Sequence, residues 1–154
     1  MKWPDAKDVS RVPYKGEIIK VKIVSVYDGD TCTAIIPFSK SFIKLSVRVE
    51  GIDTPELHVR SKKAWKDDPE RCQLEEEAGR LVRDEVKPLL EGKVCKAQLL
   101  KWDKYGGRVI AHIWPDSDQS LAEYLLERGQ ARPYAGEKKA IWTTEELRAI
   151  VKRE

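Results

Sequence analysis

The sequence has few of the residues that build metal or redox sites through sulfur and imidazole. Its 154 residues include two histidines and three cysteines, and Cys32, Cys72 and Cys95 lie far apart in the chain. Zinc sites and redox dithiols usually take their ligands from closely spaced pairs such as CxxC. The absence of such pairs argues against a zinc site, a redox dithiol and a disulfide scaffold. We expect the three cysteines to be free thiols that are at least partly buried.

Long apolar runs and a secretory signal are also missing. No stretch approaches eighteen consecutive apolar residues, and the opening residues MKWPD lack the apolar core of a signal peptide. We therefore expect no membrane segment. We also expect a cytoplasmic protein, or a secreted one if a leader has been removed.

A large excess of one charge sign is absent as well. Twenty-nine Lys and Arg residues face 26 Asp and Glu residues, which gives a formal net charge of +3. This balance permits a nucleic-acid partner without requiring one. With 41% hydrophobic and 36% charged residues, the chain has the composition of a globular domain and not that of a disordered one. Its length fits one domain, which we place at residues 17–154, after an irregular arm at 1–16 that holds Pro4 and Pro13.

Alternating apolar residues predict five strands. The first three cover residues 18–27, 31–36 and 43–49, and the phase of the alternation changes at Ile23-Val24, which indicates either a bulge or burial on both faces. The turn Asp28-Gly29-Asp30 joins the first two strands into a hairpin. Two further strands, at residues 94–102 and 108–114, flank a glycine-containing turn.

Helical spacing predicts three helices and an exposed loop. A helix begins near Glu70 and is bent or stopped by Pro88, whereas the charged residues 57–69 before it suggest a loop. A second helix covers residues 120–128, and a third begins at Thr143 with Glu146 completing a capping box. This order predicts a mainly β protein with helices. We expect a five-stranded Greek-key OB-fold barrel, with one helix between strands three and four and further helices at the C-terminus.

Three short segments carry residues suited to phosphodiester chemistry. They are Asp28-Gly29-Asp30-Thr31, Arg48 with Asp53-Thr54-Pro55-Glu56, and Asp103-Lys104-Tyr105-Gly106-Gly107-Arg108. Each segment alone is most simply a turn with charged neighbours. Taken together, they combine carboxylates that suit a hard cation, arginines that can pair with phosphate, and a carboxylate that can orient or deprotonate water.

The ordered set of motifs resembles the staphylococcal nuclease (thermonuclease) homologues. The resemblance runs from about residue 19 to 131 and rests on residues 26–31, 48–56, 103–108 and 125–131. It implies an OB-fold core and calcium-dependent endonucleolytic cleavage of DNA and RNA. Two departures from the family pattern are the second glycine in Gly106-Gly107 and the sequence of the loop after Glu56.

The resemblance also implies individual roles. It gives Asp30, Asp53 and the main-chain carbonyl of Thr54 as calcium ligands, Arg48, Glu56 and Arg108 as catalytic residues, and Lys104 and Tyr105 as substrate contacts. Tyr134, beside Arg132, either stacks on a base or packs in the core. The charged loop after Glu56 either influences substrate preference or is simply solvated.

A second function class is consistent with the same fold. OB-folds also bind nucleic acid or protein without catalysing a reaction, so a weakly active or inactive binding module is the alternative. The presence of all the acidic and arginine positions favours the enzyme. We expect Ca²⁺ as cofactor, DNA or RNA as substrate, and a monomeric protein that does not bind membranes.

Overall fold

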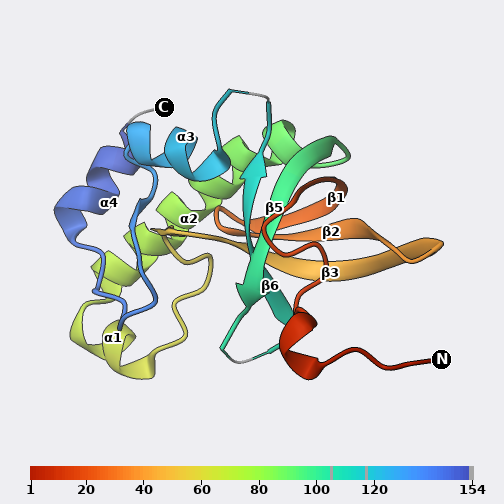
Figure 1. The fold of residues 1–154 in the computed structure, drawn as a ribbon. Helices are drawn as coiled ribbons and strands as arrows, with labels where there is room; N and C mark the ends of the chain where they lie inside the picture. The colour runs from red at the N-terminus through yellow and green to blue at the C-terminus, as the bar shows by residue number, and fades with distance from the viewer. Residues whose placement is uncertain (105, 117, 153–154) are drawn as a thin grey trace.

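Five strands close into a barrel in the computed structural model, which describes residues 1–104, 106–116 and 118–152 (Figure 1). The barrel strands are β1 (Ile18–Asp28), β2 (Thr31–Phe38), β3 (Ser41–Val49), β5 (Val94–Trp102) and β6 (Arg108–Trp114). Their order around the barrel is β1-β2-β3-β6-β5. Neighbours are antiparallel except for β3 and β6, which run parallel. The predicted five-stranded barrel with helices is confirmed.

Strand β1 closes the barrel because it belongs to two strand pairs. Its first half, Ile18 to Lys22, pairs with β5, and its second half, from Lys22 on, pairs with β2. The register with β2 shifts between Ile23 and Ser25, which confirms the irregularity predicted at this point. A bulge bends a strand and increases its twist, so one strand can serve both pairs.

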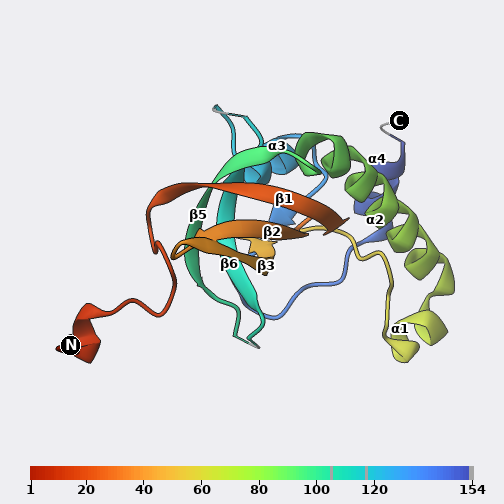
Figure 2. The ribbon, with the colours of Figure 1, turned by 90° about the vertical axis from the view of Figure 1, so that its right-hand side faces the viewer.

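The helices gather on one side of the barrel, away from the N-terminal arm (Figures 1 and 2). They are α1 (Lys62–Asp67), α2 (Pro69–Leu90), α3 (Leu121–Glu127) and α4 (Thr144–Val151). Helix α2 packs against β1 and α4, and its buried Val82, Val86 and Leu90 join the barrel core. Thr143 and Glu146 form the predicted capping box of α4.

The structure corrects one local prediction, rules out one alternative of a second, and adds two strands that were not predicted. The region 57–69 contains helix α1, capped by Ser61, and is not entirely loop. Pro88 does not end α2, which continues to Leu90. Proline in the last turn removes only one helical hydrogen bond there, and the burial of Leu90 holds the end in place. The two-residue strands β4 (Ile52–Asp53) and β7 (Arg132–Pro133) pair with each other and are too short for any periodicity to reveal.

The N-terminal segment 1–16 contains one ordered element, and the cysteines are buried as expected. The arm holds one short 3-10 helix, η1 (Ala6–Asp8), and Val12 is buried in the core. The three cysteines are free and buried, and burial raises the pKa of the Cys32 thiol to about 12. No helix in the described part of the chain is long and apolar enough to span a membrane.

Glu85 on α2 ties that helix to the segment around α3. Tyr124 Oη and Gln130 Nε2 donate hydrogen bonds to the Glu85 carboxylate at 2.8 and 2.7 Å, and Arg128 Nε lies 2.7 Å from it. Burial by itself would raise the pKa of Glu85, but these donors outweigh it and hold the pKa below its ordinary value. The ionised carboxylate therefore stabilises the folded state.

We predict that Glu85→Gln lowers the free energy of unfolding at pH 7 by about 1–2 kcal/mol. Because the pKa of Glu85 is lower in the folded state, its contribution is present above the unfolded-state pKa of about 4.3 and is lost as the pH falls through the folded value. Urea unfolding between pH 7 and 3.5 should show the difference from wild type shrinking with acidity. The exposed Glu77→Gln is the control, and a difference that is independent of pH contradicts the prediction.

Gly79 allows α2 to approach the segment that carries Glu56. A Cβ atom at position 79 would lie 2.5 Å from the Glu56 carbonyl oxygen and 2.9 Å from that of Pro55. Backbone atoms cannot move aside as a flexible side chain can. A glycine is therefore needed at this position for helix and segment to touch.

Gly79→Ala should destabilise the protein by roughly 1–3 kcal/mol, as overpacking does, although alanine favours an unobstructed helix by up to about 1 kcal/mol. Denaturant unfolding checks this, with Arg80→Ala on the exposed side of the same helix as control. A more stable Gly79→Ala protein would show that the close contact does not exist.

Candidate active site

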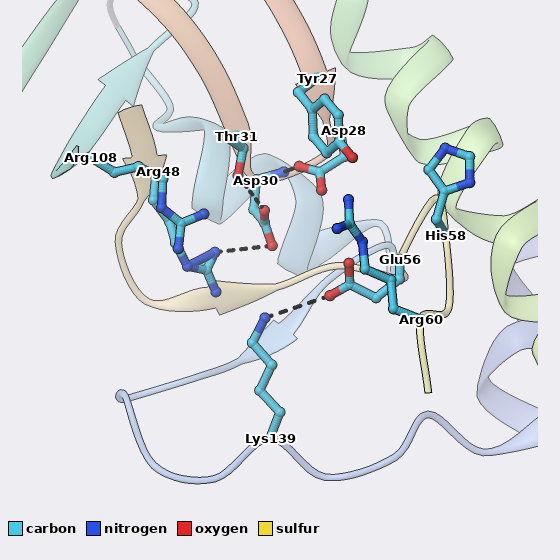
Figure 3. Close-up of a pocket in the computed structure, with 10 residues that line it drawn as sticks. All are labelled: Tyr27, Asp28, Asp30, Thr31, Arg48, Glu56, His58, Arg60, Arg108 and Lys139. Carbon is cyan, nitrogen blue, oxygen red and sulfur yellow. Dashed lines mark hydrogen bonds and ion pairs between the residues drawn. The ribbon is translucent and has the colours of Figure 1, made fainter. Parts of the chain in front are cut away.

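A pocket of about 210 Å³ opens where the β1–β2 turn, the end of β3, the start of β6 and the segment 53–60 meet (Figure 3). Its lining is strongly charged. The lining residues are Tyr27, Asp28, Asp30, Thr31, Arg48, Glu56, His58, Arg60, Arg108 and Lys139. The pocket therefore brings four of the predicted site residues, from all three motifs, to one place.

The β1–β2 turn is held tightly against its surroundings. The Asp30 amide donates to Asp28 Oδ1 at 3.1 Å, which closes the turn on itself. At Gly29, a Cβ atom would lie 2.6 Å from Val82 Cγ1 and 2.8 Å from Thr54 Cγ2. The turn thus packs directly on α2 and on Thr54, so the two Asp side chains are presented by a fixed backbone.

Asp28 and Asp30 ionise very differently although they are neighbours. Burial, and then the negative charge of Asp30, raises the pKa of Asp28 to about 8. Burial would also raise the pKa of Asp30, but the Arg48 charge and the hydrogen bonds with Asp28 and Thr31 together outweigh it and lower that pKa. The surroundings thus favour the protonated form of Asp28 and the ionised form of Asp30.

Arg48 and Arg108 enter the pocket from the parallel strands β3 and β6. Arg48 is buried, with Nη1 3.1 Å from Asp30 Oδ2 and Nη2 donating to the Ile52 carbonyl at 3.2 Å. Arg108 donates from Nε and Nη2 to Asp103 Oδ2 at 2.9 and 2.5 Å. Each guanidinium is held by a carboxylate, so both are oriented before any ligand binds.

Glu56 is positioned through its backbone by α2. The Glu56 amide donates to Glu75 Oε2 at 3.1 Å, and Glu75 is buried and paired with Arg71 at 2.7 Å. The Glu56 side chain itself remains partly exposed in the pocket, and its partial burial raises its pKa. A carboxylate with a raised pKa is a better proton acceptor than an ordinary one.

Asp53 and Thr54 lie beside the pocket and are buried. Asp53 Oδ2 accepts hydrogen bonds from Arg132 Nε and Nη2 at 3.3 and 3.2 Å. Within the described residues, neither Asp53 Oδ1 nor Thr54 Oγ1 makes a hydrogen bond of good geometry. Lys139 Nζ lies 3.3 Å from Asp53 Oδ1. The Thr54 amide donates to Asp30 Oδ2 at 3.3 Å, which brings this pair next to the β1–β2 turn.

The residues present fit a hard cation by their chemistry. Within the described residues, the buried oxygens Asp53 Oδ1 and Thr54 Oγ1 lack hydrogen bonds, and all the candidate ligand atoms are oxygens. The described part of the chain does not gather three or more His, Cys, Asp or Glu side chains into one metal cluster. A site with two carboxylates, a carbonyl and water ligands does not need such a cluster.

A larger groove of about 800 Å³ adjoins the pocket and shares Arg48 and Arg108 with it. Lys104 and Tyr134 line this groove and not the pocket. Tyr134 is half-buried and lies under the Arg48 guanidinium, 5.5 Å from Cζ to the ring centre, and it is not part of the buried core. The predicted contact Tyr105 lies outside the described residues.

Three pocket residues lie outside the motifs that the sequence analysis identified. His58 and Arg60 come from the charged loop after Glu56, and Arg60 points into the pocket (Figure 3). Lys139 comes from the irregular segment between β7 and α4. Two adjacent lysines in a segment without periodicity give no sequence signal that one of them reaches a site.

Comparison with known proteins agrees with this geometry. A sequence model of the family described as staphylococcal nuclease homologue matches residues 46–153, about 70% of the chain. A search of curated proteins finds no match. The match covers the end of β3, all the helices after it and the pocket segments 48–60 and 103–108, and the chain belongs to the staphylococcal nuclease homologues.

Proposed function

We propose that this protein is a calcium-dependent nuclease that hydrolyses phosphodiester bonds of DNA, RNA or both. One observation carries the proposal: Arg48, Arg108 and Glu56 line a single pocket beside the buried carboxyl group of Asp30. The nuclease family of the chain supports the same chemistry.

The arginines would bind and stabilise the phosphate undergoing attack. A guanidinium can donate two parallel hydrogen bonds to a pair of phosphate oxygens, and it keeps its charge at any relevant pH. Arg48 and Arg108 come from neighbouring strands, so their separation is set by the barrel and not by a loop. Fixed positive groups of this kind stabilise the negative charge that develops on a five-coordinate phosphorus.

Glu56 would orient or deprotonate the attacking water. Its backbone is held by Glu75, and its carboxylate faces the same pocket as the two arginines. In this proposal the carboxylates of Asp30 and Asp53 and the carbonyl of Thr54 hold the calcium ion. The bound ion supplies positive charge that offsets the acidic pocket and the charge accumulating on the phosphoryl oxygens.

The adjoining groove would hold the rest of the nucleotide chain. Lys104 can face the phosphates, and the Tyr134 ring offers a surface on which a base can stack. The groove continues directly from the pocket through the shared residues Arg48 and Arg108. A strand bound in it would therefore present a phosphate to both arginines.

The first test of this function is cleavage of single-stranded and duplex DNA and RNA with Ca²⁺ or with chelator. Wild type should cleave only with Ca²⁺. Glu56→Gln should lower the rate by a factor on the order of 10²–10⁴, because it removes the proton acceptor while nucleic-acid affinity is retained. Glu77→Gln is the matched control. Intact substrate with folded wild type and Ca²⁺ would sink the proposal, and normal cleavage by Glu56→Gln would remove Glu56 from it.

Arg108→Ala should reduce the turnover rate by a factor on the order of 10²–10³, the cost of removing one group that stabilises transition-state charge. The comparison is a single-turnover rate against that of Arg80→Ala, which removes an exposed arginine from α2. A rate close to wild type would mean that another group performs this role and that the second glycine before Arg108 changes the register of the motif.

A further inference from the structure

Lys139 carries a positive charge into the middle of the acidic pocket. Its Nζ lies 3.3 Å from Asp53 Oδ1. It also lies 3.7 Å from Glu56 Oε1, the ion pair drawn in Figure 3. Its charge also acts on Asp30, whose pKa it helps to lower. One ammonium group thus faces three carboxyl groups that come from two separate parts of the chain.

Lys139 lies beside the buried carboxylate of Asp53. The Asp53 side chain is only 4% exposed. Arg132 pairs with its Oδ2, and Lys139 Nζ lies 3.3 Å from its Oδ1, which makes no hydrogen bond within the described residues. A buried carboxylate without a counter-charge is costly, whereas a paired one is tolerated. Lys139 therefore neutralises charge at the place where the proposed calcium ligands converge.

The segment that carries Lys139 is anchored immediately after it. Arg132 donates to the carbonyl oxygens of Ala140 and Ile141, and its guanidinium stacks on the Trp142 ring at 4.2 Å. Helix α4 begins two residues after Trp142. Since the backbone beyond Lys139 is fixed, its side chain is directed at the pocket by the fold and not by chance.

The Lys139 side chain can nevertheless leave its position. It is 40% exposed, and it also lines the larger groove, where its Nζ lies 5.6 Å from the centre of the Tyr134 ring. A lysine side chain is long and flexible, so a modest rotation moves the ammonium from the carboxylates toward the groove. In its observed position the ammonium thus borders both cavities.

We propose that Lys139 is an internal counter-ion of the acidic pocket, which a divalent cation displaces when it binds. This inference rests on the calcium site of the proposed function. Ammonium and Ca²⁺ repel each other and share Asp53 as partner, so they cannot both occupy the carboxylates. Lys139 thus stabilises the cation-free protein, weakens Ca²⁺ binding and sets the Ca²⁺ concentration at which the site fills.

Calorimetric titration with CaCl₂ tests the competition directly. Lys139→Met should bind Ca²⁺ roughly three- to tenfold more tightly than wild type, because a repulsive charge a few ångströms away is removed in a partly solvated site. Lys138→Met, which removes the same charge from the adjacent exposed position, should match wild type. Equal affinity of Lys139→Met and wild type overturns the displacement alone. Absence of Ca²⁺ binding by all three proteins overturns the calcium site and the displacement together.

Thermal unfolding supplies a second readout that does not involve activity. With chelator, Lys139→Met should unfold about 2–6 °C below wild type, since one counter-charge of a buried carboxylate is lost. With saturating Ca²⁺ the difference should vanish, because the ion replaces the ammonium. An equal loss of stability under both conditions would assign Lys139 a purely structural role and overturn the proposal.

A measurement on the wild-type protein covers the case in which Lys139→Met does not fold. Ca²⁺ titrated into ¹⁵N-labelled protein should shift the backbone amide signals of residues 137–140 together with those of Asp30 and Thr54. Shifts confined to Asp30, Thr54 and their neighbours would mean that Lys139 stays in place when the ion binds. That result overturns the displacement even if cleavage depends on Ca²⁺.

Discussion

The crowding of carboxyl groups at one end of the barrel is the constraint on which the rest of the site depends. Asp28, Asp30, Asp53 and Glu56 lie close enough to influence one another, and three of them are buried. Such a group of acids is unfavourable unless positive charge is placed among them. Arg48, Arg132 and Lys139 supply that charge from three different segments, and burial together with the charge of Asp30 raises the pKa of Asp28.

The fold creates this crowding with two close backbone contacts and one strand pairing. Gly29 lets the β1–β2 turn touch Thr54 and α2, and Gly79 lets α2 touch the backbone of Glu56. The parallel pairing of β3 with β6 then sets Arg48 and Arg108 on neighbouring strands. The contacts that pack the helices on the barrel therefore also set the geometry of the site.

Much of this arrangement could be predicted from the sequence. Alternation gave the five strands, and turn and cap residues gave most of their ends, because these signals are local. The motifs also led to Asp30, Arg48, Glu56 and Arg108, which the structure brings to one pocket. Their roles remain predictions, as do those of Asp53, Thr54, Lys104 and Tyr134.

The features that could not be predicted from the sequence either depend on long-range contacts or are too short to show a pattern. Lys139 reaches the pocket only because Arg132 and Trp142 fix the segment around it, 86 residues after Asp53 in the chain. Arg60 lies in a charged loop whose composition is that of a solvated surface. Helix α1 and the pair β4–β7 are too short to produce a periodic pattern.

The near-neutral net charge of the chain is consistent with the proposed calcium site. A net charge of +3 includes the pocket carboxylates without the ion proposed to accompany them.

The most direct measurement is a crystal structure of the wild-type protein grown with Ca²⁺, with the ion located by anomalous scattering. We predict calcium bound to Asp30 and Asp53, with Lys139 turned toward the groove. A pocket that remains without calcium at saturating concentration, with Lys139 still paired to Asp53, would contradict this account.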